Sequence, residues 1–121
     1  VIPFEPVATC MSTTTASEPI HVEDESHFEE LTESNAVVLV DYYADWCGPC
    51  KMLEPTVEEL AAETEAAVLK VDIDALQAFA SSKGIRSVPT LEFYHNGESV
   101  DRVVGVQDKD DLLAALDEIN D

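Results

Sequence analysis

The chain alternates between continuous hydrophobic runs and stretches in which apolar residues recur every three or four positions. This alternation predicts strands separated by helices. Residues 36–44 form a nearly continuous run of β-branched, aliphatic and aromatic residues, which is typical of a central strand covered on both faces. The dipeptide Asn96-Gly97 favours a tight hairpin turn between the last two strands. The other expected strands span 20–22, 66–73, 89–94 and 98–104.

The first two predicted helices have clear start signals. Asp24 or Ser26 can cap the first helix through a side-chain oxygen. In the second helix, Pro49 occupies the first turn, where a missing N–H costs nothing, and the apolar spacing continues to about Glu63. Pro55 lies inside this helix and is expected to kink it.

Two further helices are predicted toward the end of the chain. We expect Asp74 to cap a short helix over 75–80, with Gly84 as its C-terminal stop. The last helix starts near Asp108. Its expected buried stripe consists of Leu112, Leu113, Leu116 and Ile119.

The resulting order of elements, β-α-β-α-β-α-β-β-α, belongs to the α/β class. Crossover helices imply parallel neighbouring strands, whereas the final hairpin is antiparallel, so we expect a central mixed sheet with helices on both faces. In this arrangement Cys47 lies at the carboxyl end of the central strand and at the start of a helix, where the helix dipole favours an anion. Cys50, one turn further along, is expected to be more buried and less reactive.

The composition limits location and partners. The 121 residues include 26 acidic and 6 basic side chains, a formal net charge of -20, which would repel nucleic acid or an anionic membrane. No run approaches the roughly 18 apolar residues of a membrane span, and no Lys or Arg precedes Lys51 to form the basic region of a signal peptide. These features predict a cytoplasmic protein without nucleic-acid or membrane partners.

The first 19 residues lack helical or strand periodicity, and we expect a flexible tail over 1–19 followed by one domain over 20–121. Met11 is a candidate start, with the first ten residues an upstream extension. Cys10 falls in this tail and is interpreted as a spare thiol without a catalytic role.

Cys47 and Cys50 are the only close cysteine pair in the chain. In a reducing cytosol such a pair is more often catalytic or metal-binding than structural. A zinc site would need two further ligands from Cys10, His21, His27 or His95, but no second pair has zinc-finger spacing. Redox exchange is therefore favoured, and we expect no metal.

The sequence TrpCysGlyProCysLys at the start of a proline-containing helix, within this order of elements, resembles the thioredoxin family. The resemblance extends from Ile20 to Ile119 and implies a thioredoxin fold and a thiol-disulfide oxidoreductase that reduces protein disulfides. Pro49 between the cysteines fits a reducing member, while a disulfide oxidase or isomerase and a non-catalytic interaction module stay open as alternatives. Further matches in family order are Val40, Asp41, Pro55, Lys70, residues 87–90, Asn96-Gly97 and residues 103–105.

The resemblance implies roles for residues around the motif. Cys47 would be the attacking thiolate and Cys50 the resolving thiol. Asp41 would be a buried carboxylate whose raised pKa lets it accept a proton from Cys50, with Lys70 as its partner across the strands. An ordinary surface acid at Asp41 and a solvated lysine at Lys70 are the alternatives that the residues alone leave open.

For binding, the resemblance implies a shallow apolar groove in which an extended substrate segment pairs with the backbone beside Val88. Pro89 would be the family's cis-proline facing the cysteines, and an ordinary trans proline at the start of a strand is the alternative. Routine packing is the alternative for Val88 and Val106. The groove would comprise Trp46, Gly48, Pro49, Val88, Pro89, Gly105 and Val106.

The resemblance also implies partners. Because the chain has no Gly-rich dinucleotide loop, it would need a thioredoxin reductase as electron donor, with disulfide-containing proteins as clients. We expect a monomer that needs no cofactor beyond the redox-active Cys47–Cys50 disulfide. The strong acidity is a departure from the family pattern and is typical of a protein from a halophilic organism; the acids concentrate in residues 23–33, 54–65 and 108–121.

Overall fold

A five-stranded sheet with the spatial order β1-β3-β2-β4-β5 forms the centre of the structure, which is a computed structural model. The structure describes residues 18–120, so the expectations for residues 1–17, including Cys10 and most of the tail, lie outside it. The strands are β1 (Ile20–His21), β2 (Val37–Tyr43), β3 (Ala67–Asp72), β4 (Thr90–His95) and β5 (Glu98–Val104).

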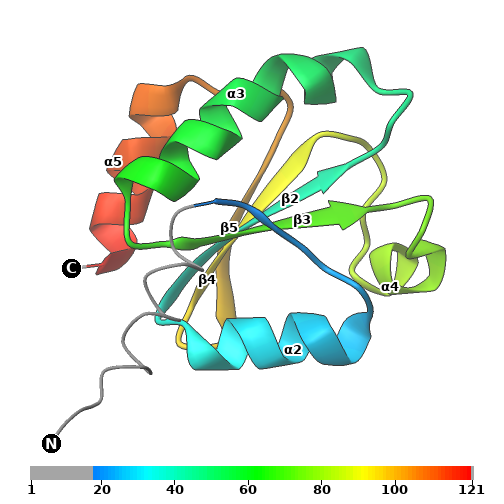
Figure 1. Ribbon diagram of the computed structural model, residues 1–121, viewed down its shortest axis with the longest axis horizontal. Coiled ribbons are helices and arrows are strands. Elements are labelled where there is room, and N and C mark those ends of the chain that lie inside the picture. Colours follow the sequence, from blue (N-terminus) through cyan, green and yellow to red (C-terminus); the bar gives the residue numbers. More distant parts are fainter. Residues whose placement is uncertain (1–17, 121) are drawn as a thin grey trace, which may run out of the picture.

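Helices cover both faces of this sheet (Figure 1). In the view of Figure 1, α3 and α5 lie over one face, and α2 and α4 lie over the other. The helices are α2 (Glu25–Ser34), α3 (Gly48–Glu63), α4 (Gln77–Ser82) and α5 (Lys109–Asn120). The order of elements and the thioredoxin fold expected from the sequence are confirmed.

The two faces of the central strand β2 are buried in separate cores, as its continuous apolar run predicts. Leu39 packs in the core beneath α3 and α5, and Val40 packs in the core beneath α2 and α4; both are fully buried. The first core includes Leu53, Val57, Leu60, Leu91, Phe93, Leu112 and Leu116, and the second includes Phe28, Leu69, Val71, Phe79 and Tyr94.

The direction of β4 differs from the expectation of parallel neighbours around the crossover helices. β3 runs parallel to β2, but β4 runs antiparallel to β2 as well as to β5. The reason is the length of α4, because six residues of helix rise only about 9 Å. A strand the length of β3 spans about 20 Å. The short helix does not carry the chain back to the end of the sheet where β2 and β3 begin. The strand β4 therefore begins at the end of the sheet where β3 finishes, and it runs in the opposite direction.

Several local predictions are confirmed and one is wrong. The Oδ1 atom of Asp24 caps α2 by accepting the His27 N–H at 2.8 Å, and Asn96 and Gly97 have φ angles of 52° and 88°, as a tight hairpin turn requires. Asp74 does not cap α4, which begins after Leu76 without a side-chain cap.

The carboxylate at the end of β3, and not the expected helix cap at Asp74, accepts the backbone N–H groups that follow the strand. The Oδ1 atom of Asp72 accepts the backbone N–H groups of Asp74 at 2.9 Å and Ala75 at 3.3 Å. The side chain of Asp74 is therefore free for another contact. Within residues 18–120, no helix has both the length and the apolar character needed to cross a membrane.

Candidate active site

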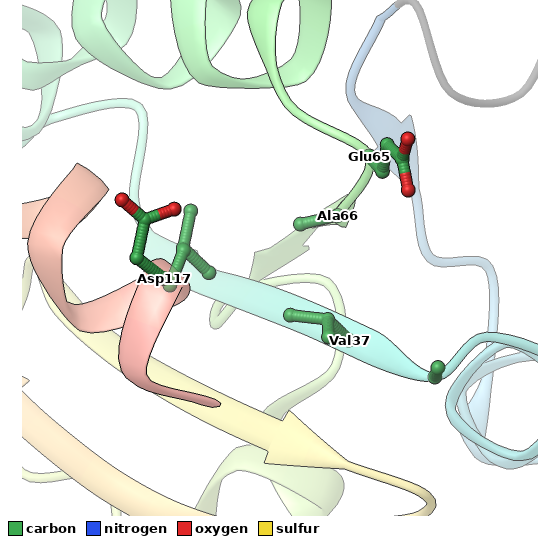
Figure 2. Close-up of a pocket in the computed structure, with 6 residues that line it drawn as sticks. Val37, Glu65, Ala66 and Asp117 are labelled. Carbon is green, nitrogen blue, oxygen red and sulfur yellow. The ribbon is translucent and has the colours of Figure 1, made fainter. Parts of the chain in front are cut away.

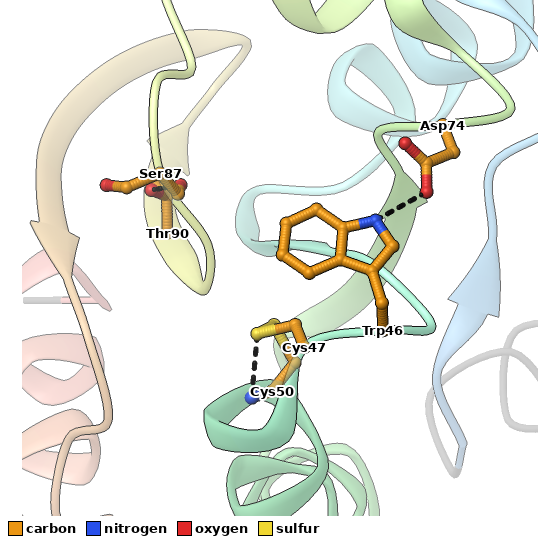
Figure 3. The surroundings of a disulfide bond; sticks show 6 residues. All are labelled: Trp46, Cys47, Cys50, Asp74, Ser87 and Thr90. Atoms are coloured by element: carbon orange, nitrogen blue, oxygen red, sulfur yellow. Dashed lines mark hydrogen bonds between the residues drawn. A yellow bond between two sulfur atoms is a disulfide. The ribbon is translucent and has the colours of Figure 1, made fainter.

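The cysteine pair lies where β2 passes into α3. Cys47 is the N-cap of α3, with extended backbone angles, and Pro49 lies in the first turn, as the sequence predicts. The two cysteines form a disulfide with their Cα atoms 5.3 Å apart. The Cys50 N–H donates to the Cys47 Sγ at 3.1 Å (Figure 3). In the reduced protein the same N–H and the helix dipole would stabilise negative charge on this sulfur.

Exposure does not separate the two cysteines in this disulfide state. Cys47 is 4% exposed and Cys50 is 5% exposed, so the expected greater burial of Cys50 is wrong here. Both sulfurs belong to a small cluster at the end of the sheet, because the disulfide ties them together. Their asymmetry rests on position in the helix, since Cys47 accepts the N–H bond and Cys50 donates it.

Trp46 stands at the rim of the site. Its side chain is 69% exposed, and its indole Nε1–H donates to the Oδ2 atom of Asp74 at 2.8 Å. Figure 3 shows this pair on one side of the cysteines and the loop at Ser87 and Thr90 on the other. Asp74 therefore orients the indole, which was missed from the sequence because nothing local links positions 28 residues apart.

Asp41 is buried on the face of β2 that meets α3, the helix whose first turn carries the cysteine pair. The residue is 1% exposed, its Oδ1 atom has no hydrogen-bond partner, and its neighbour in β4 is the apolar Leu91. Burial raises the pKa of this carboxyl from 3.8 to about 6; Lys70 lowers it in part, and Glu54 raises it. A carboxyl with this pKa is a proton acceptor at neutral pH.

Lys70 lies beside Asp41 in the register of β2 and β3, but its ammonium pairs elsewhere. The Nζ atom lies 3.3 Å from the Oε2 atom of Glu54 in α3 and 4.4 Å from the centre of the Tyr43 ring. Lys70 is 7% exposed, so an ordinary solvated lysine is excluded. Glu54 was missed from the sequence, although its spacing of four residues from Cys50 places both on one helix face.

The residues expected to form the groove are brought partly together. Val88 packs against the cysteine cluster, and the Val88–Pro89 peptide bond is cis. The Gly105 N–H donates to the Pro89 carbonyl at 2.8 Å, which joins the loop after β5 to the loop before β4. Pro89 itself is buried, whereas Trp46, Gly48, Pro49 and Val106 are exposed.

Another pocket, at the opposite end of β2, is separate from this chemistry (Figure 2). It has a volume of about 110 Å³ and contains the carboxylates of Glu65 and Asp117 beside Val37, but no cysteine or buried titratable group. Over residues 18–120, no three or more His, Cys, Asp or Glu side chains are grouped so that they could hold a metal ion.

Comparison with known proteins agrees with this geometry. The family model described as Thioredoxin matches residues 18–118. Thioredoxin of Rickettsia felis is 45% identical over 95 residues, covering 77% of this chain and 90% of the relative. Thioredoxin of Chlamydia muridarum is 48% identical over 84 residues, covering 69% and 82%. The solved structure of a mutant thioredoxin from Halobacterium salinarum superposes with a TM-score of 0.85 at 48% identity, covering 88% of this chain and 95% of the other.

A disulfide that caps a helix directly after the carboxyl end of the central strand β2 is the site of a thiol-disulfide oxidoreductase. With the family match over 18–118, the chain belongs to the thioredoxin family. It reduces protein disulfides by dithiol-disulfide exchange through Cys47 and Cys50. The alternative of a zinc-binding structural module is therefore set aside.

Proposed function

We propose that the two cysteines act in a fixed order, with Cys47 attacking the client disulfide and Cys50 resolving the product. The observation that carries this order is the place of the Cys47 Sγ at the N-cap of α3, where the Cys50 N–H points at it from 3.1 Å. The Cys47 thiolate attacks one client sulfur, a Cys47–client disulfide forms, and the other client sulfur leaves as a thiolate that takes up a proton.

In the second step the Cys50 thiol loses its proton and attacks the Cys47 sulfur. The Cys47–Cys50 disulfide forms, and the second client sulfur leaves as a thiolate that is then protonated, so two electrons pass from the dithiol to the client. We assign the proton acceptor to Asp41, acting through water, because its carboxyl is buried on the face of β2 that meets the cysteine-bearing helix α3 and its pKa of about 6 suits the task. Lys70 contributes positive charge beside this carboxyl.

Trapping of the mixed disulfide tests the order of attack. In a Cys10→Ser background, Cys50→Ser should accumulate covalent adducts with an oxidised client protein, because the second step is blocked. Cys47→Ser should form none, and the variant lacking both Cys47 and Cys50 is the matched control. Mass spectrometry measures the amount of covalent adduct on each variant. Abundant adducts on Cys47→Ser would overturn the assignment.

The client segment is proposed to bind in the groove described above. Trp46 and Val106 offer exposed apolar surface at the rim, with exposed fractions of 69% and 47%. Val88 of the cis Val88–Pro89 unit packs against the cysteine cluster, and its backbone is proposed to pair with an extended client chain. Gly48 and Gly105 support close approach, since a Cβ atom built on either would meet nothing within 4 Å.

The surroundings of the protein are proposed from its charge and family. A thioredoxin reductase would return electrons to the Cys47–Cys50 disulfide, and the protein would work as a cytoplasmic monomer without a further cofactor. We also propose adaptation to a salt-rich cytoplasm, because a net charge of -20 repels itself in dilute buffer. The exposed acids of α2, including Glu29, Glu30 and Glu33, support this proposal.

A further inference from the structure

We propose that Glu54 is a positioning residue for the resolving step, which holds the Lys70 ammonium away from Asp41 and so keeps the Asp41 carboxylate unpaired. The proposal rests on the role given to Asp41 above. It goes beyond that role, because it names the residue that decides where the nearest positive charge lies.

The register of the sheet makes Asp41 the obvious partner of Lys70. The two residues are opposite each other on parallel strands and both are buried, with exposed fractions of 1% and 7%. Residues paired in this way point to the same face of the sheet. A lysine beside a buried carboxylate is ordinarily drawn to it, because the ion pair offsets the cost of burying both charges.

The ammonium nevertheless contacts Glu54. The Lys70 Nζ lies 3.3 Å from the Glu54 Oε2 and over the Tyr43 ring, while the Asp41 Oδ1 is left without any hydrogen-bond partner. Glu54 is half exposed, so its carboxylate remains solvated while it holds a buried cation. The pair meets solvent in a shallow pocket at the sheet edge that Glu58 and His21 also line.

Charged groups reach Asp41 from two of the surrounding elements. Lys70 comes from β3 and Glu54 from α3, while β4 contributes the apolar Leu91, and His21 of β1 lies beyond Lys70 in the same row and is exposed. Burial raises the pKa of Asp41, Lys70 lowers it and Glu54 raises it again. Glu54 thus acts on the Asp41 pKa in two ways, through its own charge and by engaging the Lys70 ammonium.

Neutralising Glu54 should release Lys70 toward Asp41. We expect Glu54→Gln to lower the Asp41 pKa by about 1 unit or more, since an opposite charge at about 4–6 Å lowers a carboxyl pKa by about 1–3 units. The matched control is Glu58→Gln, which removes the same charge one turn further along α3 at the same pocket but outside the Lys70 ion pair.

The measurement is a carbon-13 NMR titration of the Asp41 carboxyl in the oxidised full chain, with Asp41→Asn identifying the signal. A fall in the Asp41 pKa with Glu54→Gln, together with a much smaller change in this pKa with Glu58→Gln, supports the proposal. Equal shifts in the two variants, or no shift with Glu54→Gln, overturn it. This titration does not depend on whether Asp41 accepts the proton, so it fails separately from the proposed mechanism.

A second comparison separates positioning of Lys70 from the simple loss of a negative charge. In a Lys70→Gln background, Glu54→Gln should shift the Asp41 pKa by clearly less than it does with Lys70 present. A shift of the same size in both backgrounds would show that Glu54 acts through its own charge alone and would overturn the positioning role. With Lys70 present, the pH midpoint of mixed-disulfide resolution should fall together with the Asp41 pKa.

Discussion

Replacing Asp41 with Asn should stabilise the protein at neutral pH, and the gain should disappear in acid. The reason is the raised pKa of this buried carboxyl, about 6 compared with an ordinary value of 3.8. Between these two pH values the unfolded chain releases the Asp41 proton while the folded chain keeps it. The folded state therefore binds more protons, and the free energy of unfolding falls as the pH rises through this window.

The size of the effect follows from the two pKa values. A difference of about 2 pKa units corresponds to about 3 kcal/mol, which is the cost of the ionised carboxylate in the folded state above pH 7. At pH 4 the same relation gives a destabilisation by Asp41 of only about 0.5 kcal/mol. The buried amide of the variant has its own desolvation cost, but that cost does not depend on pH. The difference between pH 7 and pH 4 should therefore be about 2 kcal/mol.

Urea unfolding of the parent and of Asp41→Asn, at several pH values from 4 to 8 in molar potassium chloride, measures this difference. Asp45→Asn removes the same charge from an exposed position near the same strand end and serves as control. A stability difference between the parent and Asp41→Asn that stays constant from pH 4 to 8 would refute the reasoning. The same Asp41→Asn protein should release the mixed disulfide more slowly at neutral pH, and an unchanged rate would refute the catalytic role alone.

Two further predictions concern charge elsewhere in the molecule. Burial would raise the pKa of Glu92, but hydrogen bonds from Ser99, Tyr42 and Arg102 outweigh burial and lower it, so its contribution to stability is present above its ordinary pKa and is lost as the pH falls. Glu92→Gln should lower the free energy of unfolding by roughly 1–3 kcal/mol at pH 7 and should reduce the loss of stability in acid. Urea unfolding at several pH values measures both changes, with the exposed Glu98→Gln as control. Equal changes in stability for the two variants would contradict the reasoning. Because the screening length falls from about 30 Å at 0.01 M to about 3 Å at 1 M salt, the melting temperature should rise and the Cys47 thiol pKa should fall as potassium chloride is added. Calorimetry and alkylation rates measure these changes, and flat values of both would remove the proposed salt adaptation.

The elements of the fold could be predicted because their signals are local. The apolar run that became β2 and the Asn96-Gly97 turn each depend on neighbouring residues alone. The antiparallel direction of β4 could not be read in this way, because it depends on how far α4 carries the chain across the sheet. Asp74 shows the same limit, since its contact with Trp46 joins positions that only the completed fold brings together.

The part of the candidate site that could be predicted is the part that lies in or beside the cysteine motif. The cysteines and Asp41 follow from the sequence and the family resemblance, and the structure places Asp41 in the apolar setting that its neighbours in β2 suggest. The ion pair of Lys70 could not be predicted, because two carboxylates compete for one ammonium and side-chain geometry decides between them. Glu54 was one exposed acid among many in the sequence until its contact with Lys70 was known.

Two buried carboxylates in the same sheet have opposite pKa shifts because their surroundings differ. Asp41 and Glu92 are 1% and 3% exposed, and they lie on opposite faces. Glu92 accepts bonds from two tyrosines, a serine and an arginine, whereas the Asp41 Oδ1 accepts none. Burial without partners raises the pKa of the first carboxyl, and satisfied hydrogen bonds lower that of the second. Because an unpaired buried carboxylate destabilises the fold, the burial of Asp41 without a partner supports the proposed role in proton transfer.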